Sequence, residues 1–361
     1  MYLFFAQMIF LDHDILPSPL QVIEDERLLG GNIRLFLKRD DLLHDSFKEI
    51  LFGDNEILKS ISGNKFRKLK YNLLFDKQED FKKVLTFGGA FSNHIHAVAA
   101  AGQFYGIETI GVIRGEKTAA LNPTLRFAER CGMVLHFINR SDYRDKNLII
   151  NELTHQFGDF YYLPEGGTNA LAMRGTAEIV GEIKQQMDGT VPDFLAVACG
   201  TGGTVTGIIS ATEPPTQVLG FSALKGDFLQ KDVANLLETL KNAPNTEGYD
   251  FSTSNQKTFK NAPNTEGSYF SENTPNWSIN TDFHFGGYAR WTPELIDFIN
   301  DFKQKHGVQL DPIYTGKMLF GIFKLVEMGF FPPNSSIVAI HTGGLQGIEG
   351  FNQRFGELIK K

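Results

Sequence analysis

The stretch that decides the fold reads Ser62-Gly63-Asn64-Lys65-Phe66-Arg67-Lys68-Leu69. It predicts the start of a helix, because the apolar residues of this run and its continuation recur at helical spacing, at Phe66, Leu69, Leu73 and Leu74. Ser62 and Asn64 are both able to cap that start. We therefore place Lys65 in the first turn of a helix with one buried face.

Lys65 has two interpretations in this position. A lysine in the first turn lies beside unpaired backbone N–H groups and the positive end of the helix dipole, which disfavours its ammonium form. Burial would lower its pKa further, and a Schiff-base lysine needs a neutral amine. The alternative is a solvated basic face, because cationic residues surround it, at Lys59, Arg67, Lys68 and Lys70. The run alone favours the solvated face, and the rest of the chain favours the reactive lysine.

Composition and charge limit the class of protein. The chain has 361 residues and 42% hydrophobic content, enough for a sizeable core and for two domains or lobes. Its net charge of −7 argues against nucleic acid or an anionic membrane as the main partner. Residues 1–10 are apolar, but they lack a positive segment and are too short to span a bilayer. Two cysteines, Cys131 and Cys199, indicate a reducing compartment rather than a disulfide framework. We therefore expect a cytoplasmic enzyme or binding protein.

Strand-like and helix-like segments alternate along most of the chain. The predicted strands cover residues 84–87, 109–113, 133–137, 160–163, 194–198 and 337–340. The predicted helices cover residues 93–104, 123–131 and 169–187. The last two strands are short, apolar and bounded by glycines, as buried parallel strands are. The alternation predicts an α/β protein with an open sheet and helices on both of its faces.

One segment interrupts this alternation. The run Lys241-Asn242-Ala243-Pro244-Asn245-Thr246-Glu247-Gly248 recurs unchanged at residues 260–267. Two copies are too few for a solenoid, and Asn, Thr, Pro and Gly are typical of turns. We interpret residues 241–276 as a duplicated surface insertion.

Glycine-bearing turns follow four of the predicted strands, at the end where ligands bind in an open α/β sheet. They lie at residues 88–94, 165–168, 200–204 and 341–344. The third, Gly200-Thr201-Gly202-Gly203-Thr204, has the composition of a phosphate-binding turn, because glycines let backbone N–H groups converge on an anion. It is neither a dinucleotide fingerprint, since Val205 replaces the third glycine, nor a Walker loop. It indicates a smaller phosphorylated cofactor, or else an ordinary strand–helix turn without a ligand.

Two other turns offer polar groups. Ser92 and Asn93 could donate to a substrate carboxylate at a helix start, or could simply cap that helix. Thr342 could donate to, or accept from, a ring nitrogen, or could cap a turn.

Together these motifs resemble the pyridoxal-phosphate enzymes of the tryptophan synthase β-like fold, and among them the group of 1-aminocyclopropane-1-carboxylate deaminase and D-cysteine desulfhydrase. The matching stretches follow the family's order, at residues 38–41, 63–69, 92–94, 200–204, 311–317 and 341–344. The resemblance implies two open, twisted, mostly parallel sheets flanked by helices, with pyridoxal 5'-phosphate between two domains. The large domain would comprise residues 1–67 and 168–361, and the small domain residues 68–167.

The resemblance also implies catalytic roles. Lys65 would bind the cofactor covalently and later move the substrate Cα proton. Ser92 would act near the substrate carboxylate and the reacting centre, and Tyr314 would lie over the active site. Asn93 would contact the cofactor's ring oxygen, and Thr342 its pyridine nitrogen. The phosphate would bind Gly200, Thr201, Gly202, Gly203 and Thr204. The substrate-binding residues would be Asn64, Ser92, Asn93, His94, Tyr288 and Tyr314. No metal is expected.

The expected reaction is the conversion of D-cysteine to pyruvate, ammonia and sulfide. Thr315 and Thr342 stand where the cyclopropane deaminases usually have glutamate and leucine, and both follow the desulfhydrase pattern. Around Tyr288 the chain departs from both groups, with alanine where glycine is common. The alternatives are a cyclopropane-carboxylate deaminase, a racemase or dehydratase on the same scaffold, and an inert cofactor-binding paralogue. A homodimer is expected by resemblance alone.

Overall fold

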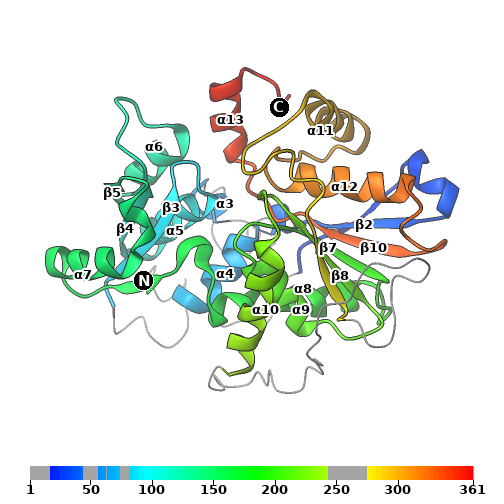
Figure 1. Cartoon of the computed structure of the whole chain (residues 1–361), viewed down its shortest axis with the longest axis horizontal. Coiled ribbons are helices and arrows are strands. Elements are labelled where there is room, and N and C mark those ends of the chain that lie inside the picture. The colour runs from blue at the N-terminus through cyan, green and yellow to red at the C-terminus, as the bar shows by residue number, and fades with distance from the viewer. Residues whose placement is uncertain (1–16, 44–55, 62, 74–80, 243–274, 361) are drawn as a thin grey trace.

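The computed structural model describes residues 17–43, 56–61, 63–73, 81–242 and 275–360. Two sheets, each flanked by helices, lie side by side in it (Figure 1). The expected α/β class with two mostly parallel sheets is therefore confirmed. The first two and the last two residues of the predicted insertion, 241–242 and 275–276, are described, and residues 243–274 lie outside the described residues.

The larger sheet has six strands in the order β1-β2-β10-β7-β8-β9. Their bounds are Leu20–Ile23 (β1), Arg34–Lys38 (β2), Phe194–Cys199 (β7), Gln217–Ser222 (β8), Trp277–Asn280 (β9) and Ser336–Ile340 (β10). β1 runs antiparallel to β2, and the other neighbours pair in parallel. β7 and β10 form the centre and are buried along their whole length, as their apolar sequences predict.

Helices cover both faces of the larger sheet. Phe194 and Ala196 of β7 face a core that includes residues of α11 (Pro293–His306) and α12 (Thr315–Glu327). Leu195 and Val197 face the opposite core, built with α8 (Ala170–Gln186), α9 (Gly203–Ala211) and α10 (Phe228–Lys241). Successive residues of a strand point to opposite faces, so one apolar strand contributes to both cores.

The smaller sheet has four parallel strands in the order β5-β4-β3-β6. Their bounds are Lys83–Gly89 (β3), Glu108–Arg114 (β4), Val134–Ile138 (β5) and Tyr161–Leu163 (β6). α5 (Asn93–Tyr105) and α6 (Pro123–Arg130) contribute to the core on one face, and α7 (Lys146–Phe157) to the core on the other. The short helices and turns of the described chain include α3 (Glu56–Lys59), η1 (Glu26–Gly31), η2 (Asp40–Leu42), η4 (Asp142–Arg144) and η5 (Glu165–Gly167). α13 (Gly347–Phe355) follows β10 near the end of the chain.

α4 (Asn64–Leu73) lies between the two halves (Figure 1). Its predicted apolar stripe is confirmed at Phe66, Leu69 and Leu73, which join the core around α5. Leu74 and the candidate cap Ser62 lie outside the described residues. Its other side touches α8, where a Cβ built on Gly175 would come within 1.9 Å of the Arg67 carbonyl oxygen. The domain boundaries remain a prediction, and the one after residue 67 falls inside α4.

Candidate active site

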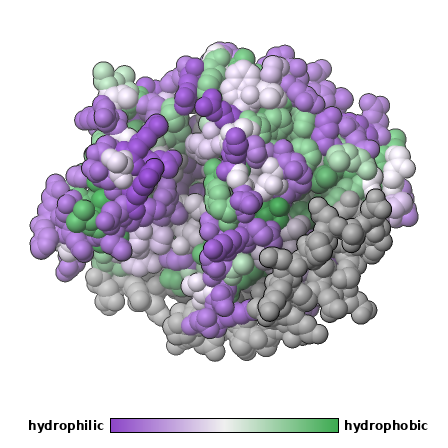
Figure 2. Space-filling model, in the orientation of Figure 1, coloured by the Kyte–Doolittle hydropathy of each residue, from purple (hydrophilic) through white to green (hydrophobic). Residues whose placement is uncertain are grey.

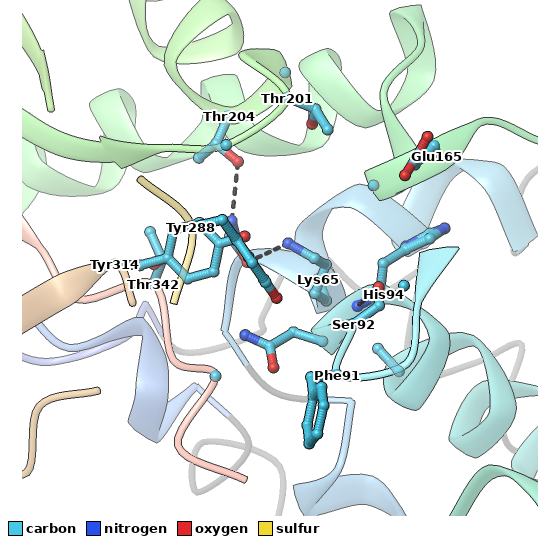
Figure 3. Close-up of a pocket in the computed structure, with 18 of the residues that line it drawn as sticks. Lys65, Phe91, Ser92, His94, Glu165, Thr201, Thr204, Tyr288, Tyr314 and Thr342 are labelled. Carbon is cyan, nitrogen blue, oxygen red and sulfur yellow. Dashed lines mark hydrogen bonds between the residues drawn. The ribbon is translucent and has the colours of Figure 1, made fainter. Parts of the chain in front are cut away.

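Lys65 stands in the first turn of α4, where the sequence places it. Its Nζ donates to Asn64 Oδ1 at 3.1 Å, and Asn64 Nδ2 donates to Thr204 Oγ1 at 2.9 Å (Figure 3). Asn64 therefore connects the lysine to the glycine-rich turn. Burial lowers the pKa of Lys65 to about 8, because desolvation disfavours the ammonium. The amine is thus much closer to neutrality at physiological pH than a solvated lysine would be.

The predicted phosphate turn joins β7 to α9. Gly202 takes φ +82° and caps α9, a conformation that L side chains rarely adopt. The first N–H groups of the helix have no intrahelical partner and point outward from this turn. A Cβ at Gly200 would come within 3.2 Å of the Tyr314 ring. The backbone is thus open to an anion here and closely approached by an aromatic ring.

Lys68 is a site residue that the sequence analysis missed. It follows Lys65 by three residues, so both lie on one side of α4. Its Nζ donates to the Gly166 carbonyl at 2.9 Å and lies 3.0 Å from a Cβ built on Gly203. Burial, together with the charge of Lys65, holds the Lys68 pKa well below its usual range. The three-residue spacing from Lys65 could have predicted that Lys68 lies on the same side of the helix.

Ser92 caps α5, as the alternative interpretation anticipated. Its Oγ accepts from the backbone N–H groups of His94 and Ile95 at 3.2 and 3.3 Å. Capping leaves the hydroxyl proton available to a ligand. Asn93 Oδ1 accepts from Gln346 Nε2 at 3.1 Å, which ties the start of α5 to the turn before α13.

His94 is buried and held in one tautomer. Thr86 Oγ1 donates to the Leu163 carbonyl at 2.8 Å, so it accepts from His94 Nε2 at 2.9 Å. Burial and the charges of Lys65 and Lys68 hold the His94 pKa well below its usual range. His94 is therefore neutral, with its proton on Nε2.

Tyr314 and Tyr288 form the opposite wall. Their ring centroids lie 6.3 Å apart in an edge-to-face arrangement. Burial raises the pKa of Tyr288 to about 12 and that of Tyr314 well above its usual range. Both phenols are therefore protonated at neutral pH.

Thr342 lies on the turn that supports α4. Its carbonyl accepts from the Asn64 N–H at 3.1 Å, and a Cβ on Gly63 would come within 2.3 Å of that carbonyl oxygen. Gly63, at φ +72°, therefore permits this close approach.

Thr315 differs from Thr342 in its surroundings. It is fully buried at the start of α12, where its hydroxyl donates to Asp311 Oδ2 at 2.6 Å. It does not line the pocket, so its effect on a bound ring would be indirect. Of the two threonines that favoured the desulfhydrase pattern, only Thr342 faces the site.

A pocket of about 700 Å³ between the two sheets collects every residue predicted for the site. Those residues are Asn64, Lys65, Ser92, Asn93, His94, Gly200, Thr201, Gly202, Gly203, Thr204, Tyr288, Tyr314 and Thr342. Further lining residues that the sequence analysis did not assign include Lys68, Arg114, Arg140, Arg144, Glu165 and Arg354.

A buried ionic cluster fixes α4 behind the pocket. Arg67 donates to both oxygens of Asp40, at 2.7 and 2.8 Å, and pairs with Glu182 at 2.7 Å. Lys38 pairs with the same Glu182 at 2.6 Å. Arg67 and Lys68 each expose only 2% of their surface. The interpretation of this run as a solvated basic face is therefore wrong for both residues.

The residues present fit pyridoxal phosphate. Lys65 supplies an amine of lowered pKa inside the pocket. The start of α9 offers backbone N–H groups to a phosphate, with Lys68 Nζ beside Gly203 as a further hydrogen-bond donor. Among the described residues, no group of three or more His, Cys, Asp or Glu could hold a metal ion. Within the same ranges, no helix has the length and apolar character needed to cross a membrane.

Comparison with known proteins agrees with this geometry. The model of the family "Pyridoxal-phosphate dependent enzyme" matches residues 13–343. The "Bifunctional D-cysteine desulfhydrase/1-aminocyclopropane-1-carboxylate deaminase, mitochondrial" of Arabidopsis thaliana is 28% identical over 92% of this chain and 77% of its own length.

Solved structures share the fold. An ACC deaminase homologue superposes with a TM-score of 0.73 at 23% identity, covering 99% of each chain. A fungal L-serine ammonia-lyase from Rhizomucor miehei gives 0.57 at 14% identity, over 94% of this chain and 98% of that one. The expected tryptophan synthase β-like fold is thereby confirmed. The chain belongs to the family of pyridoxal-phosphate dependent enzymes.

Proposed function

We propose that the chain is a lyase that removes the β-substituent of a small amino acid, with D-cysteine as the first candidate. In the balanced reaction, D-cysteine and water give pyruvate, ammonia and hydrogen sulfide. The observation that carries the proposal is the enclosed Lys65 amine, connected through Asn64 to Thr204 of the glycine-rich turn. This arrangement supports a lysine that both holds the cofactor and moves a proton.

Different residues of the chain would carry out the separate steps of this reaction. When bound, pyridoxal phosphate would supply the electron sink that stabilises negative charge at the substrate Cα. Lys65 Nζ would take the Cα proton, since an amine with a pKa of about 8 is partly neutral near pH 7. The hydroxyl proton of Ser92 would bind the substrate carboxylate. Protonated Tyr314 would face the departing group.

A cyclopropane-carboxylate deaminase is the second candidate. The name of the Arabidopsis relative covers both activities. Thr342 in the pocket supports the desulfhydrase, whereas Thr315 carries less weight than its sequence position implied, because its side chain is occupied by Asp311. A cytoplasmic location and a homodimer remain predictions.

A substrate panel tests the proposal. The holoenzyme is offered D-cysteine, L-cysteine, D-serine and 1-aminocyclopropane-1-carboxylate separately, and the 2-oxo acids are identified by mass. We expect pyruvate from D-cysteine, and 2-oxobutyrate from the cyclopropane substrate would favour the second candidate. A yellow protein that forms no product from any of them would support the inert paralogue.

Lys65→Ala is the matching variant. It should lose both turnover and the covalent cofactor, which borohydride reduction and peptide mass detect. Lys82→Ala, at an exposed lysine outside the pocket, is the control for loss of one lysine. Retained turnover in Lys65→Ala would overturn the proposed role.

A further inference from the structure

The pocket is strongly basic in an acidic chain. Its lining includes four arginines, two lysines of lowered pKa and a single carboxylate, that of Glu165, although the net charge of the protein is −7. The arginines are Arg114, Arg140, Arg144 and Arg354. Figure 2 shows the hollow between the lobe that carries α6 and α7 and the lobe that carries α10 and α13, with hydrophilic side chains on its rim. Arg114, Arg140 and Arg144 come from the first lobe, and Arg354 comes from α13.

These arginines are not neutralised within the described parts of the chain. None of the four forms an ion pair with another described residue. Glu165, the carboxylate of the lining, is already paired with Lys146 at 2.6 Å. The positive charge of the guanidinium groups therefore remains available to a ligand.

Arg114 lies beside the turn that leads to Ser92 and lines the pocket. It ends β4, and its Nη2 is 3.7 Å from a Cβ built on Gly89, at the turn that leads to Ser92. Its guanidinium stands 5.7 Å from the Tyr143 ring centroid. Arg114 and Tyr288 line the same pocket.

The cofactor and a simple amino acid would leave this charge unbalanced. The phosphate would be met by the start of α9 and Lys68, and an amino acid brings one positive and one negative group. A small neutral side chain such as that of cysteine gives the arginines nothing to bind. Guanidinium groups pair bidentately with carboxylate, sulfonate and phosphate. The pocket of about 700 Å³ also lies in the upper part of the range of roughly 300–1,000 Å³ found for small-molecule sites.

We infer that the preferred substrate carries a second anionic group on its β-substituent, bound by Arg114 with the other pocket arginines. This inference rests on the proposed lyase function and refines it: cysteine would be a minimal substrate, and the favoured leaving group would be an acidic one. The elimination stays balanced. The Cα–H and Cβ–X bonds break, X departs with its electron pair, and water completes the 2-oxo acid and ammonia.

Matched substrate pairs test the inference by turnover. Serine is compared with O-phosphoserine, each as both enantiomers, and the ratio of their kcat/KM values is the readout. We expect the anionic member to be favoured at least tenfold, chiefly through KM. Arg114→Gln should reduce that ratio at least tenfold, and Arg114→Lys should restore part of it. Arg130→Gln, an exposed arginine at the end of α6 outside this pocket, is the control and should leave the ratio unchanged.

Binding without turnover provides an independent measurement. The holoenzyme is titrated calorimetrically with 2-amino-3-phosphonopropionate, whose C–P bond is not a leaving bond, and with alanine. Tighter binding of the phosphonate, lost in Arg114→Gln, supports the inference even if no lyase activity is found. Turnover of neutral amino acids without anionic preference would overturn the inference and leave the lyase function standing. Equal effects of Arg114→Gln and Arg130→Gln would also overturn it, since they would indicate general steering by surface charge.

Discussion

Lys65 shows how one side chain acquires reactivity from its surroundings. Its position in the first turn of α4 was readable from the apolar spacing of the helix. Its enclosure was not, because that depends on Thr204 and on the turn at Thr342, both distant in sequence. The lowered pKa is thus a product of the assembled pocket, with desolvation as its cause.

The pKa of Lys65 gives the first prediction. In the cofactor-free protein, trinitrobenzenesulfonate should modify Lys65 with a midpoint near pH 8, because only the neutral amine is nucleophilic. An unperturbed lysine would react with a midpoint near about 10.4. Peptide mass spectrometry across a pH series measures the modification residue by residue. A Lys65 midpoint at or above pH 10 would contradict the described enclosure.

At the scale of elements, the contact of α4 with α8 positions the site. Gly175 allows the two helices to touch at the backbone of Arg67, next to Lys65. A methyl group there would meet a carbonyl oxygen rather than a flexible side-chain end. The helices would have to separate, which would shift the lysine relative to the phosphate turn.

Gly175→Ala and Gly181→Ala form a matched pair on α8. Gly175→Ala should destabilise the protein by about 1–3 kcal/mol through overpacking and should weaken cofactor binding. Gly181 has no atom within 4 Å of a built Cβ, so Gly181→Ala should stabilise the protein by up to about 1 kcal/mol through helix propensity. Urea unfolding and cofactor titration of both variants give the comparison. If the two substitutions had the same effect on stability and cofactor binding, the close contact between α4 and α8 would not be what makes Gly175 necessary.

Some elements could be predicted from sequence and others could not. The central strands β7 and β10 are short, mainly apolar runs, each followed by a glycine-bearing turn, a pattern typical of buried parallel strands. β2 was not predicted, because the charged residues Arg34 and Lys38 at its two ends leave an apolar run of only three residues. Lys38 is buried because Glu182, far along the chain, pairs with it and because the Ser18 carbonyl and Gln186 accept hydrogen bonds from it. The four-residue strand β9 offers too short a pattern to detect.

The residues of the site also fall into some that the sequence predicted and some that it could not. Local motifs marked the lysine, the serine cap and the glycine-rich turn. Arg114 and Arg354 carry no local motif, and only the packing of the two sheets brings them to one pocket. The sequence also could not show that Thr315 lies outside the pocket, because this depends on the hydrogen bond from its hydroxyl to Asp311. The sequence therefore predicted the residues around the cofactor better than the residues that would select the substrate.

At the scale of the whole molecule, the charge is distributed unevenly. A protein of net charge −7 concentrates cations at one hollow, so the local field there attracts anions that the rest of the surface repels. The phosphate of the cofactor and the carboxylate of an amino acid both benefit. The buried cluster of Lys38, Asp40, Arg67 and Glu182 serves a different purpose, since it joins β2, α4 and α8 away from the pocket.

That cluster predicts acid sensitivity of the whole fold. Burial alone would raise the pKa of Glu182, but Arg67 and Lys38 outweigh it and hold the pKa at about 2. The folded pKa lies below the unfolded value of about 4.3, so the stabilisation is fully present above about pH 5 and is lost as pH falls toward 2. A shift of this size corresponds to about 3 kcal/mol. Urea unfolding at pH 5 and pH 3 should therefore show a steeper loss in the wild type than in Glu182→Gln.

The informative quantity is the difference between the two pH slopes, because Glu182→Gln leaves Arg67 with one carboxylate fewer and is already less stable at pH 5. Glu129→Gln, at an exposed carboxylate of α6, controls for the loss of one acidic group. If the free energy of unfolding fell equally with pH in the wild type and in Glu182→Gln, protonation of Glu182 would not be what destabilises the fold in acid. If only Glu182→Gln shows a reduced slope, the pairing of Glu182 with Arg67 and Lys38 sets the lowest pH at which the fold around Lys65 is stable.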